Sequence, residues 1–323
     1  MDNQFREKGK RLHQMIESSD SICILGHIRP DGDCVGSTLA VYNYITDRYK
    51  GKTVDVYLDT FPASMKFLNG ARKVKHDATG KHYDLAISID VSDTERLGKF
   101  KDLYLTSIST VCIDHHVSNT GFGDLCFVDA EASSACEAFA ELIDPEEISL
   151  NTANCLYLGI VHDTGVFKYS CTRRNTMELA GLLLEKGVDS SMIIDETFYK
   201  KSYKQNLLMA RTILESVTYM DGKVIVGYIS KDTMKDFKAN VLDTEGIVEQ
   251  LRLTDGVEIA VFAYQMTKKT FKFSLRAKNY ADVNIIATKF GGGGHVKASG
   301  FEATGVYEEL LAELLEEIKL QIR

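Results

Sequence analysis

The sequence has no tryptophan and only 3 prolines, and no apolar run reaches the ~18 residues of a membrane-spanning helix. Residues 1–7 also lack the apolar segment of a secretory signal peptide. None of the 7 cysteines forms a Cys-x-x-Cys pair, and most lie in apolar segments typical of buried free thiols. We therefore expect a cytoplasmic protein with no membrane partner.

An excess of basic residues is also absent, since the formal net charge is −8. Binding of long nucleic acid depends on many phosphate contacts from a basic surface, so this class of partner is not expected. Short nucleotides stay possible, because bound divalent cations would make a cleft locally positive. The length of 323 residues allows two domains, each with its own core.

The first half alternates strand and helix patterns. Strands are predicted at residues 21–25, 54–58, 85–90, 110–114 and 126–129, and helices at 37–49, 133–143, 151–162 and 176–187. This alternation predicts an α/β fold, with a mostly parallel sheet covered by helices. Ligands of such sheets bind beyond the carboxyl ends of the strands.

The second half has a different pattern. Hairpins are predicted at 217–220 with 224–230 and at 257–266 with 270–277, followed by helices at 283–290 and 307–322. We expect a smaller α+β domain here. The predicted boundaries are 1–190 for the catalytic domain, 191–212 for a helical connector and 213–323 for the second domain.

Carboxylates and imidazoles gather at four places in the first half. Three clusters follow predicted strands and the fourth lies in an apolar helix; they are His27 with Asp31 and Asp33, Asp90, Asp114-His115-His116, and Asp163. This donor mixture favours Mn²⁺, Fe²⁺ or Zn²⁺-like ions over Ca²⁺, and a pair of such ions suggests hydrolysis of a phosphate ester. The alternative for the first cluster is an Asp-rich turn that caps the helix near Ser37.

The run Asp114-His115-His116 cannot supply three ligands from a simple strand, because successive side chains diverge. We assign His115 as a metal ligand and His116 to the phosphate or the leaving oxygen. Asp114 is expected to orient a neighbouring group. A purely structural histidine is the alternative for His116.

Four consecutive glycines, Gly291–Gly294, are unsuited to a helix or a strand. Their backbone N–H groups can approach an anion closely, and His295 and Ser299 follow at once. Arg276 is a candidate for a second phosphate through its bidentate fork. The alternatives are a flexible linker for the glycines and an exposed strand position for Arg276.

These motifs, in this order along nearly the whole chain, resemble the DHH family of phosphoesterases. The resemblance implies one metal held by His27, Asp31 and Asp90, and a second held by Asp33, Asp90, His115 and Asp163, with Asp90 bridging. It implies two Mn²⁺, with Mg²⁺, Fe²⁺ or Co²⁺ as alternatives, and catalytic roles for Asp90, Asp114 and His116. The implied substrate loop of the second domain contains Arg276, Gly292, Gly293, Gly294, His295 and Ser299.

A few positions depart from the family pattern or have open roles. His162 stands beside Asp163, where a structural role is favoured over a ligand. Lys168 occupies a position that often carries arginine in relatives. Arg173 and Arg174 suit a surface or a substrate role equally, and Cys34 is expected to pack and not to act as a nucleophile.

The resemblance is to the branch of nanoRNases and pAp phosphatases. It implies hydrolysis of 3′-phosphoadenosine 5′-phosphate, RNA of a few nucleotides, or linear and cyclic dinucleotides by activated water. The partner would be a small nucleotide or a short RNA, and a homodimer is an open alternative. Two other functions are a manganese-dependent inorganic pyrophosphatase and a non-catalytic nucleotide sensor.

Overall fold

The computed structural model describes residues 3–78 and 80–322. The chain divides between Lys200 and Lys201 into two compact units, which are described separately here. The segment 191–212, expected as a connector, is helical but is divided between the units: Ser190–Ile194 (α7) belongs to the first and Tyr203–Leu214 (α8) to the second. No helix among the described residues has the length and apolar character needed to cross a bilayer.

The first unit contains a five-stranded sheet in which all neighbours are parallel. The strands are Ser21–Leu25 (β1), Thr53–Tyr57 (β2), Leu85–Ile89 (β3), Ser109–Asp114 (β4) and Leu125–Val128 (β5), in the order β2-β1-β3-β4-β5. The predicted α/β class and the five predicted strands are thus confirmed to within one residue at each end.

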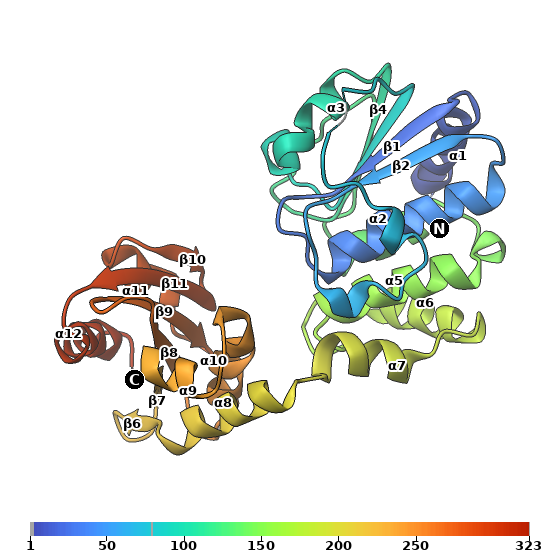
Figure 1. Cartoon of the computed structure of the whole chain (residues 1–323). Coiled ribbons are helices and arrows are strands. Elements are labelled where there is room, and N and C mark those ends of the chain that lie inside the picture. Colours follow the sequence, from blue (N-terminus) through green and yellow to red (C-terminus); the bar gives the residue numbers. More distant parts are fainter. Residues whose placement is uncertain (1–2, 79, 323) are drawn as a thin grey trace. The chain divides into compact units, whose positions relative to one another are not determined.

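Helices cover both faces of this sheet. They are Asn3–Glu17 (α1), Gly32–Arg48 (α2), Lys101–Leu105 (α3), Ala135–Ala140 (α4), Leu150–Asp163 (α5) and Arg174–Glu185 (α6). Alternate residues of β1 divide between two cores: Ile22 and Ile24 pack with α2 and α5, and Cys23 and Leu25 pack on the side of α3. Figure 1 shows α2 and α3 on opposite sides of the sheet.

The strand order places a topological switch point between β1 and β3. The chain first adds β2 on one side of β1 and then crosses over to add β3, β4 and β5 on the other side. Ligands of open parallel sheets bind beyond the carboxyl ends of the strands at such a point. His27 lies just after β1 and Asp90 directly after β3. The fold therefore brings two of the predicted ligands to the position where this architecture forms a site.

The second unit is a mixed sheet with helices, as the predicted α+β pattern required. Its strands are Val217–Tyr219 (β6), Val224–Ile229 (β7), Ile259–Gln265 (β8), Thr270–Ala277 (β9), Gly293–His295 (β10) and Ala298–Thr304 (β11), in the order β10-β11-β9-β8-β7-β6. Its longer helices are α8, Val283–Lys289 (α11) and Tyr307–Lys319 (α12), with the short Lys231–Asp236 (α9) and Ile247–Arg252 (α10) between β7 and β8. Both predicted hairpins are present.

Two local expectations are wrong. The run of glycines was expected to avoid strands, yet Gly293 and Gly294 pair with Gly300 and Ser299 in β10 and β11. A side chain at Gly294 would meet the carbonyl oxygen of Ala298 at 2.5 Å, so glycine is what lets the two strands approach. The helix expected from Ser37 begins five residues earlier, at Gly32, because Asp31 caps it.

Candidate metal centre

The segment after β1 turns sharply into α2. Asp31 is the N-cap of that helix, and its Oδ1 accepts the backbone N–H groups of Asp33 and Cys34, each at 3.1 Å. His27 is buried, and its Nδ1 lies 2.8 Å from the carbonyl oxygen of Ile28, which leaves Nε2 toward the carboxylates. Capping and ligation are compatible, since Asp31 Oδ1 is also 3.8 Å from His27 Nε2.

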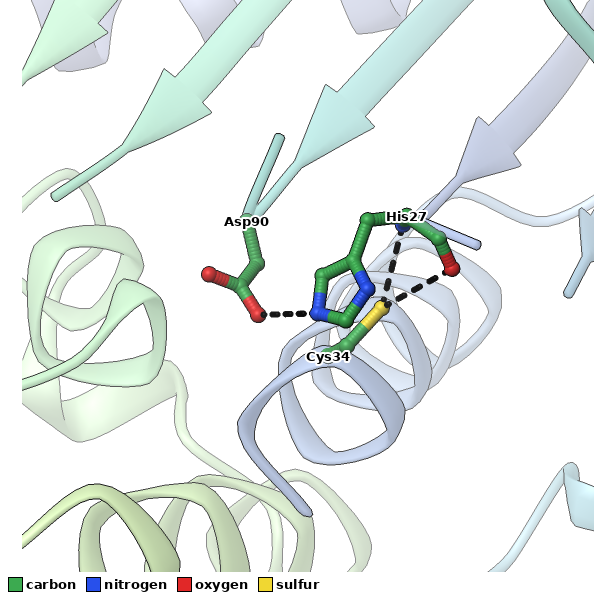
Figure 2. Close-up of side chains that lie close together, drawn as sticks. All are labelled: His27, Cys34 and Asp90. Carbon is green, nitrogen blue, oxygen red and sulfur yellow. Dashed lines mark hydrogen bonds and ion pairs between the residues drawn. The ribbon is translucent and has the colours of Figure 1, made fainter. Parts of the chain in front are cut away.

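Asp90 lies between two histidines. Its Oδ2 is 3.4 Å from His27 Nε2, as Figure 2 shows, and its Oδ1 is 3.5 Å from His115 Nε2. Asp90 has a left-handed backbone conformation with a φ of 60°, which is uncommon for residues other than glycine and turns the chain sharply after β3. Each oxygen of this carboxylate therefore faces a different imidazole, as a carboxylate shared by two ions would require.

A second group forms around His115. Its Nε2 is 3.3 Å from Asp163 Oδ2 and 3.8 Å from Asp33 Oδ2. The fully buried Asp33 also accepts the backbone N–H groups of Ala135 at 2.6 Å and Cys136 at 3.1 Å, at the start of α4. These contacts fix the Asp33 carboxylate at a positive helix terminus.

The charges of this cluster are not balanced within the protein. Burial and the nearby Asp90 raise the pKa of Asp33 to about 7, and burial and Asp33 raise the pKa of Asp163 to about 9. Burial disfavours a charged His115, but the carboxylates, Asp90 foremost, outweigh it and raise its pKa to about 10. The site thus has more buried carboxylate than the two imidazoles can neutralise, and added positive charge would relieve the repulsion.

The spacing also suits metal ions. The histidine nitrogens lie 3.3–3.8 Å from the carboxylate oxygens, longer than ordinary hydrogen bonds. Two ligand atoms that are each ~2.1 Å from one ion lie about 3.0–3.5 Å apart. Among the described residues, Asp33, His115 and Asp163 form one compact set of donor atoms, and Asp90 joins another with His115 and His116. A mixed imidazole and carboxylate set of this kind fits divalent transition metals.

His116 is held by a buried chain of hydrogen bonds. Its Nδ1 donates to Asp114 Oδ1 at 2.8 Å, and the amide of Asn119 donates to Asp114 Oδ2 at 2.7 Å. Asp114 is the last residue of β4 and is fully buried, and it raises the pKa of His116 although burial opposes this. With Nδ1 occupied, His116 presents Nε2 for proton transfer. No role for Asn119 was predicted from the sequence. Its only signal there is its position three residues after His116.

Cys34 and His162, which lie beside the metal centre, are held by packing and hydrogen bonds. The thiol of Cys34 accepts the backbone N–H of His27 at 3.2 Å (Figure 2), and burial raises the pKa of Cys34 to about 12. The ring of His162 fills the space where a side chain at Gly32 would stand, only 2.1 Å from the ideal Cβ position. Its Nε2 is 3.0 Å from Thr197 Oγ1. Both arrangements favour structural roles.

Among the remaining open positions, Lys168 and Arg174 are exposed and Arg173 is half-buried. Arg173 pairs with Glu131 at 2.7 Å and Arg174 with Glu178 at 2.6 Å. Lys168 lies in the turn that follows α5. The exposed ion pair with Glu178 favours the surface alternative for Arg174.

The predicted substrate residues all lie in the second unit. Arg276 of β9, Ala298 of β11 and His295 of β10 are paired across neighbouring strands, so Arg276 and His295 project from the same face about 10 Å apart. Ser299 is buried on the opposite face, and its hydroxyl donates to the carbonyl oxygen of Val283 at 2.6 Å. Gly292 packs against Phe301, and Gly293 and Gly294 form β10.

Two family models match this chain. The DHH family N-terminal domain matches residues 21–160, and the DHHA1 domain matches residues 221–323. The chain belongs to the DHH family. The first match contains every predicted metal ligand except Asp163, and the second contains the predicted substrate loop.

Individual relatives agree with this assignment. The bifunctional oligoribonuclease and PAP phosphatase NrnA of Bacillus subtilis is 28% identical over 90% of this chain and 91% of its own length. A probable enzyme of the same name from Streptococcus mutans is 33% identical, but that match spans 56% of this chain and 57% of the relative. The crystal structure of an exopolyphosphatase-related protein from Bacteroides fragilis has a TM-score of 0.85 and 25% identity over 96% of this chain and 95% of its own.

Proposed function

We propose that this DHH protein is a metal-dependent phosphoesterase that hydrolyses short nucleotide phosphoesters. The observation that carries the proposal is Asp90, whose two oxygens face His27 and His115 within a buried cluster of carboxylates. His27, Asp31 and Asp90 would hold one divalent ion, and Asp33, Asp90, His115 and Asp163 the other. We propose Mn²⁺ for both, with Mg²⁺, Fe²⁺ or Co²⁺ as alternatives.

Bound divalent ions would supply an activated water molecule and neutralise the charge of the phosphate. The protein itself provides the proton for the leaving oxygen. His116 has its Nδ1 fixed by Asp114, so its Nε2 can give a proton to the departing ester oxygen. The hydrogen bond with Asp114 raises the pKa of His116 and so favours the protonated form that this step requires. Asn119 holds Asp114 in turn and so limits rotation of the dyad.

The substrate class follows from the relatives and the charge. The NrnA proteins that this chain resembles are named as oligoribonucleases and PAP phosphatases, and the net charge of −8 offers no basic track for a long strand. Arg276 and His295 on one face of the second sheet would bind a further phosphate of a short substrate. The free thiols of the cysteines are consistent with the reducing cytoplasm, which we propose as its location.

The test is an activity panel with Mn²⁺ at fixed salt. The substrates are 3′-phosphoadenosine 5′-phosphate, 5′-labelled RNAs of 2, 3, 5 and 24 nucleotides, cyclic di-AMP and pyrophosphate, with Asp90→Ala as the control for contaminating nucleases. We expect kcat/KM to fall steeply with RNA length. Equal efficiency on the 24-mer and the dimer would refute the preference for short substrates. Pyrophosphate as the best substrate, or binding without turnover, would refute the phosphoesterase assignment.

A further inference from the structure

Two cysteines outside the metal centre stand side by side in the first sheet. Cys112 of β4 and Cys126 of β5 are direct partners in the parallel ladder. Paired residues in neighbouring strands have Cα atoms about 4.8 Å apart and side chains on the same face. That separation lies inside the range of about 4.4–6.8 Å found for disulfides. Both thiols are free in the structure.

The two thiols differ in access and in acidity. Cys112 is buried, whereas Cys126 lies on the edge strand and lines a surface pocket of about 490 Å³ together with Lys8 and Arg11. The neighbouring Cys112 thiol, the backbone N–H of Phe122 and the charge of Lys8 outweigh burial and lower the pKa of Cys126 to about 6. A partly exposed thiol with these neighbours is the kind that reacts as a thiolate near neutral pH.

The buried partner touches the hydrogen-bond chain that holds His116. The side-chain amide of Asn119 lies 3.4 Å from Cys112 Sγ, and it donates to Asp114 Oδ2 at 2.7 Å and to the carbonyl oxygen of Val91 at 3.1 Å. Movement of the Cys112 sulfur toward Cys126 would remove one of the three contacts of Asn119 Nδ2, while Asn119 Oδ1 would still accept the backbone N–H of Gly121 at 2.8 Å. Because Asn119 anchors Asp114, this loss would loosen the dyad with His116.

We propose that Cys126 and Cys112 form a reversible disulfide that lowers turnover by releasing Asn119. The effect on turnover rests on the proposed function, whereas the disulfide does not. The oxidant is a low-molecular-weight disulfide. The Cys126 thiolate attacks one of its sulfurs and expels one thiolate, and Cys112 then attacks the mixed disulfide at Cys126 and expels the second. Two protein thiols lose two electrons, the oxidant is reduced to two thiols, and the protons of the cysteines pass to them.

The test uses the full chain and glutathione disulfide as the oxidant. Free thiols are counted with a chromogenic reagent, and non-reduced peptides are identified by mass spectrometry. We expect the loss of two thiols per chain and one cross-linked peptide pair containing Cys112 and Cys126. Turnover of an RNA dimer should fall about 10-fold or more, since a positioned general acid contributes about 10²–10⁴-fold, and dithiothreitol should restore it.

Three variants separate the steps. In Cys112→Ser, the reaction should stop at the mixed disulfide between Cys126 and glutathione. In Cys126→Ser, oxidation should change neither the number of free thiols nor the turnover measured before oxidation. Cys171→Ser is the matched control, because Cys171 is the other partly exposed cysteine of the described residues, and it should oxidise as the natural sequence does.

Two results would overturn the proposal. Absence of the cross-linked peptide, or oxidation at Cys171 instead, refutes the disulfide. Formation of the disulfide with unchanged turnover refutes its link to His116. A reduced protein that hydrolyses no nucleotide refutes the proposed function, and the peptide analysis then still decides whether the disulfide forms.

Discussion

Gly159 of α5 offers a sharp test of how the metal centre is packed. A Cβ at this position would lie 2.5 Å from Asp33 Oδ1 and 2.3 Å from Cys136 Sγ, both far inside ordinary contact distance. In Gly159→Ala, the Asp33 carboxylate must therefore move by about 0.5–1 Å to reach a normal separation. Asp33 is anchored by the N–H groups of Ala135 and Cys136, so this movement also strains the start of α4.

The expected effect on stability is modest, and the effect on metal binding is larger. Overpacking costs about 1–3 kcal/mol, whereas alanine in place of glycine favours a helix by about 1 kcal/mol. We expect a net loss of up to about 2 kcal/mol in the free energy of unfolding. Displacement of a proposed ligand should weaken Mn²⁺ binding about 10–100-fold, a range seen when the surroundings of metal ligands are disturbed.

The assays are Mn²⁺ titration by calorimetry and urea unfolding without metal. Gly181→Ala is the matched control, since Gly181 is an exposed residue of α6 and a Cβ there meets no atom within 4 Å. It should stabilise the protein by about 0.5–1 kcal/mol and leave metal affinity unchanged. If Gly159→Ala binds Mn²⁺ as tightly as Gly181→Ala, then Asp33 is not a ligand or its position is not constrained.

Three further predictions concern the same centre. Asp90→Ala should lower turnover at least ~100-fold with the fold intact, and near-native activity would remove its bridging role. Asp114→Asn should lower the pKa of His116 and reduce kcat by about 10²-fold or more; a pH–rate profile that keeps its natural midpoints would contradict this. Without metal, the raised pKa values of Asp33 and Asp163 mean that the folded state binds more protons than the unfolded chain above pH ~4, so stability should fall as pH rises from about 5 to 9. Chelated protein whose melting temperature rises over this interval would refute that sign.

The sequence located the first unit well because its signals are local. Short apolar runs mark parallel strands buried on both faces, and their ends fix which polar residues meet at the sheet edge. His27, Asp90 and Asp114 could be assigned to that edge without coordinates. The expected divergence of His115 and His116 is wrong, since their ring centroids lie 4.9 Å apart and both rings face Asp90 Oδ1, at 3.5 and 3.7 Å. What separates them is the hydrogen bond from His116 Nδ1 to Asp114, which His115 lacks.

What the sequence could not show depends on contacts between distant segments. Nothing near Asp33 indicates that its carboxylate meets the N-terminus of α4, about a hundred residues later. Asn119 belongs to no motif recognised in the sequence, yet its side chain contacts Asp114, Cys112 and the carbonyl oxygen of Val91 in the loop after β3. The glycine run was misjudged because propensity opposes a strand there. A Cβ at Gly292 would lie 2.3 Å from the carbonyl oxygen of Gly300, and one at Gly294 would lie 2.5 Å from that of Ala298, so the close approach to β11 requires residues without side chains at these two positions.

The glycines of α2 and α5 explain how a buried acidic centre fits this fold. A Cβ at Gly36 would lie 2.6 Å from the carbonyl oxygen of Cys155 and 2.9 Å from the backbone nitrogen of Gly159, so the two helices cross in close contact. The same crossing places Asp33, near the start of α2, against α5, which carries Asp163 at its end. Helix propensity alone would disfavour glycine at both positions. The approach of the helices therefore accounts for these glycines, and it concentrates carboxylates whose mutual repulsion a divalent cation would relieve.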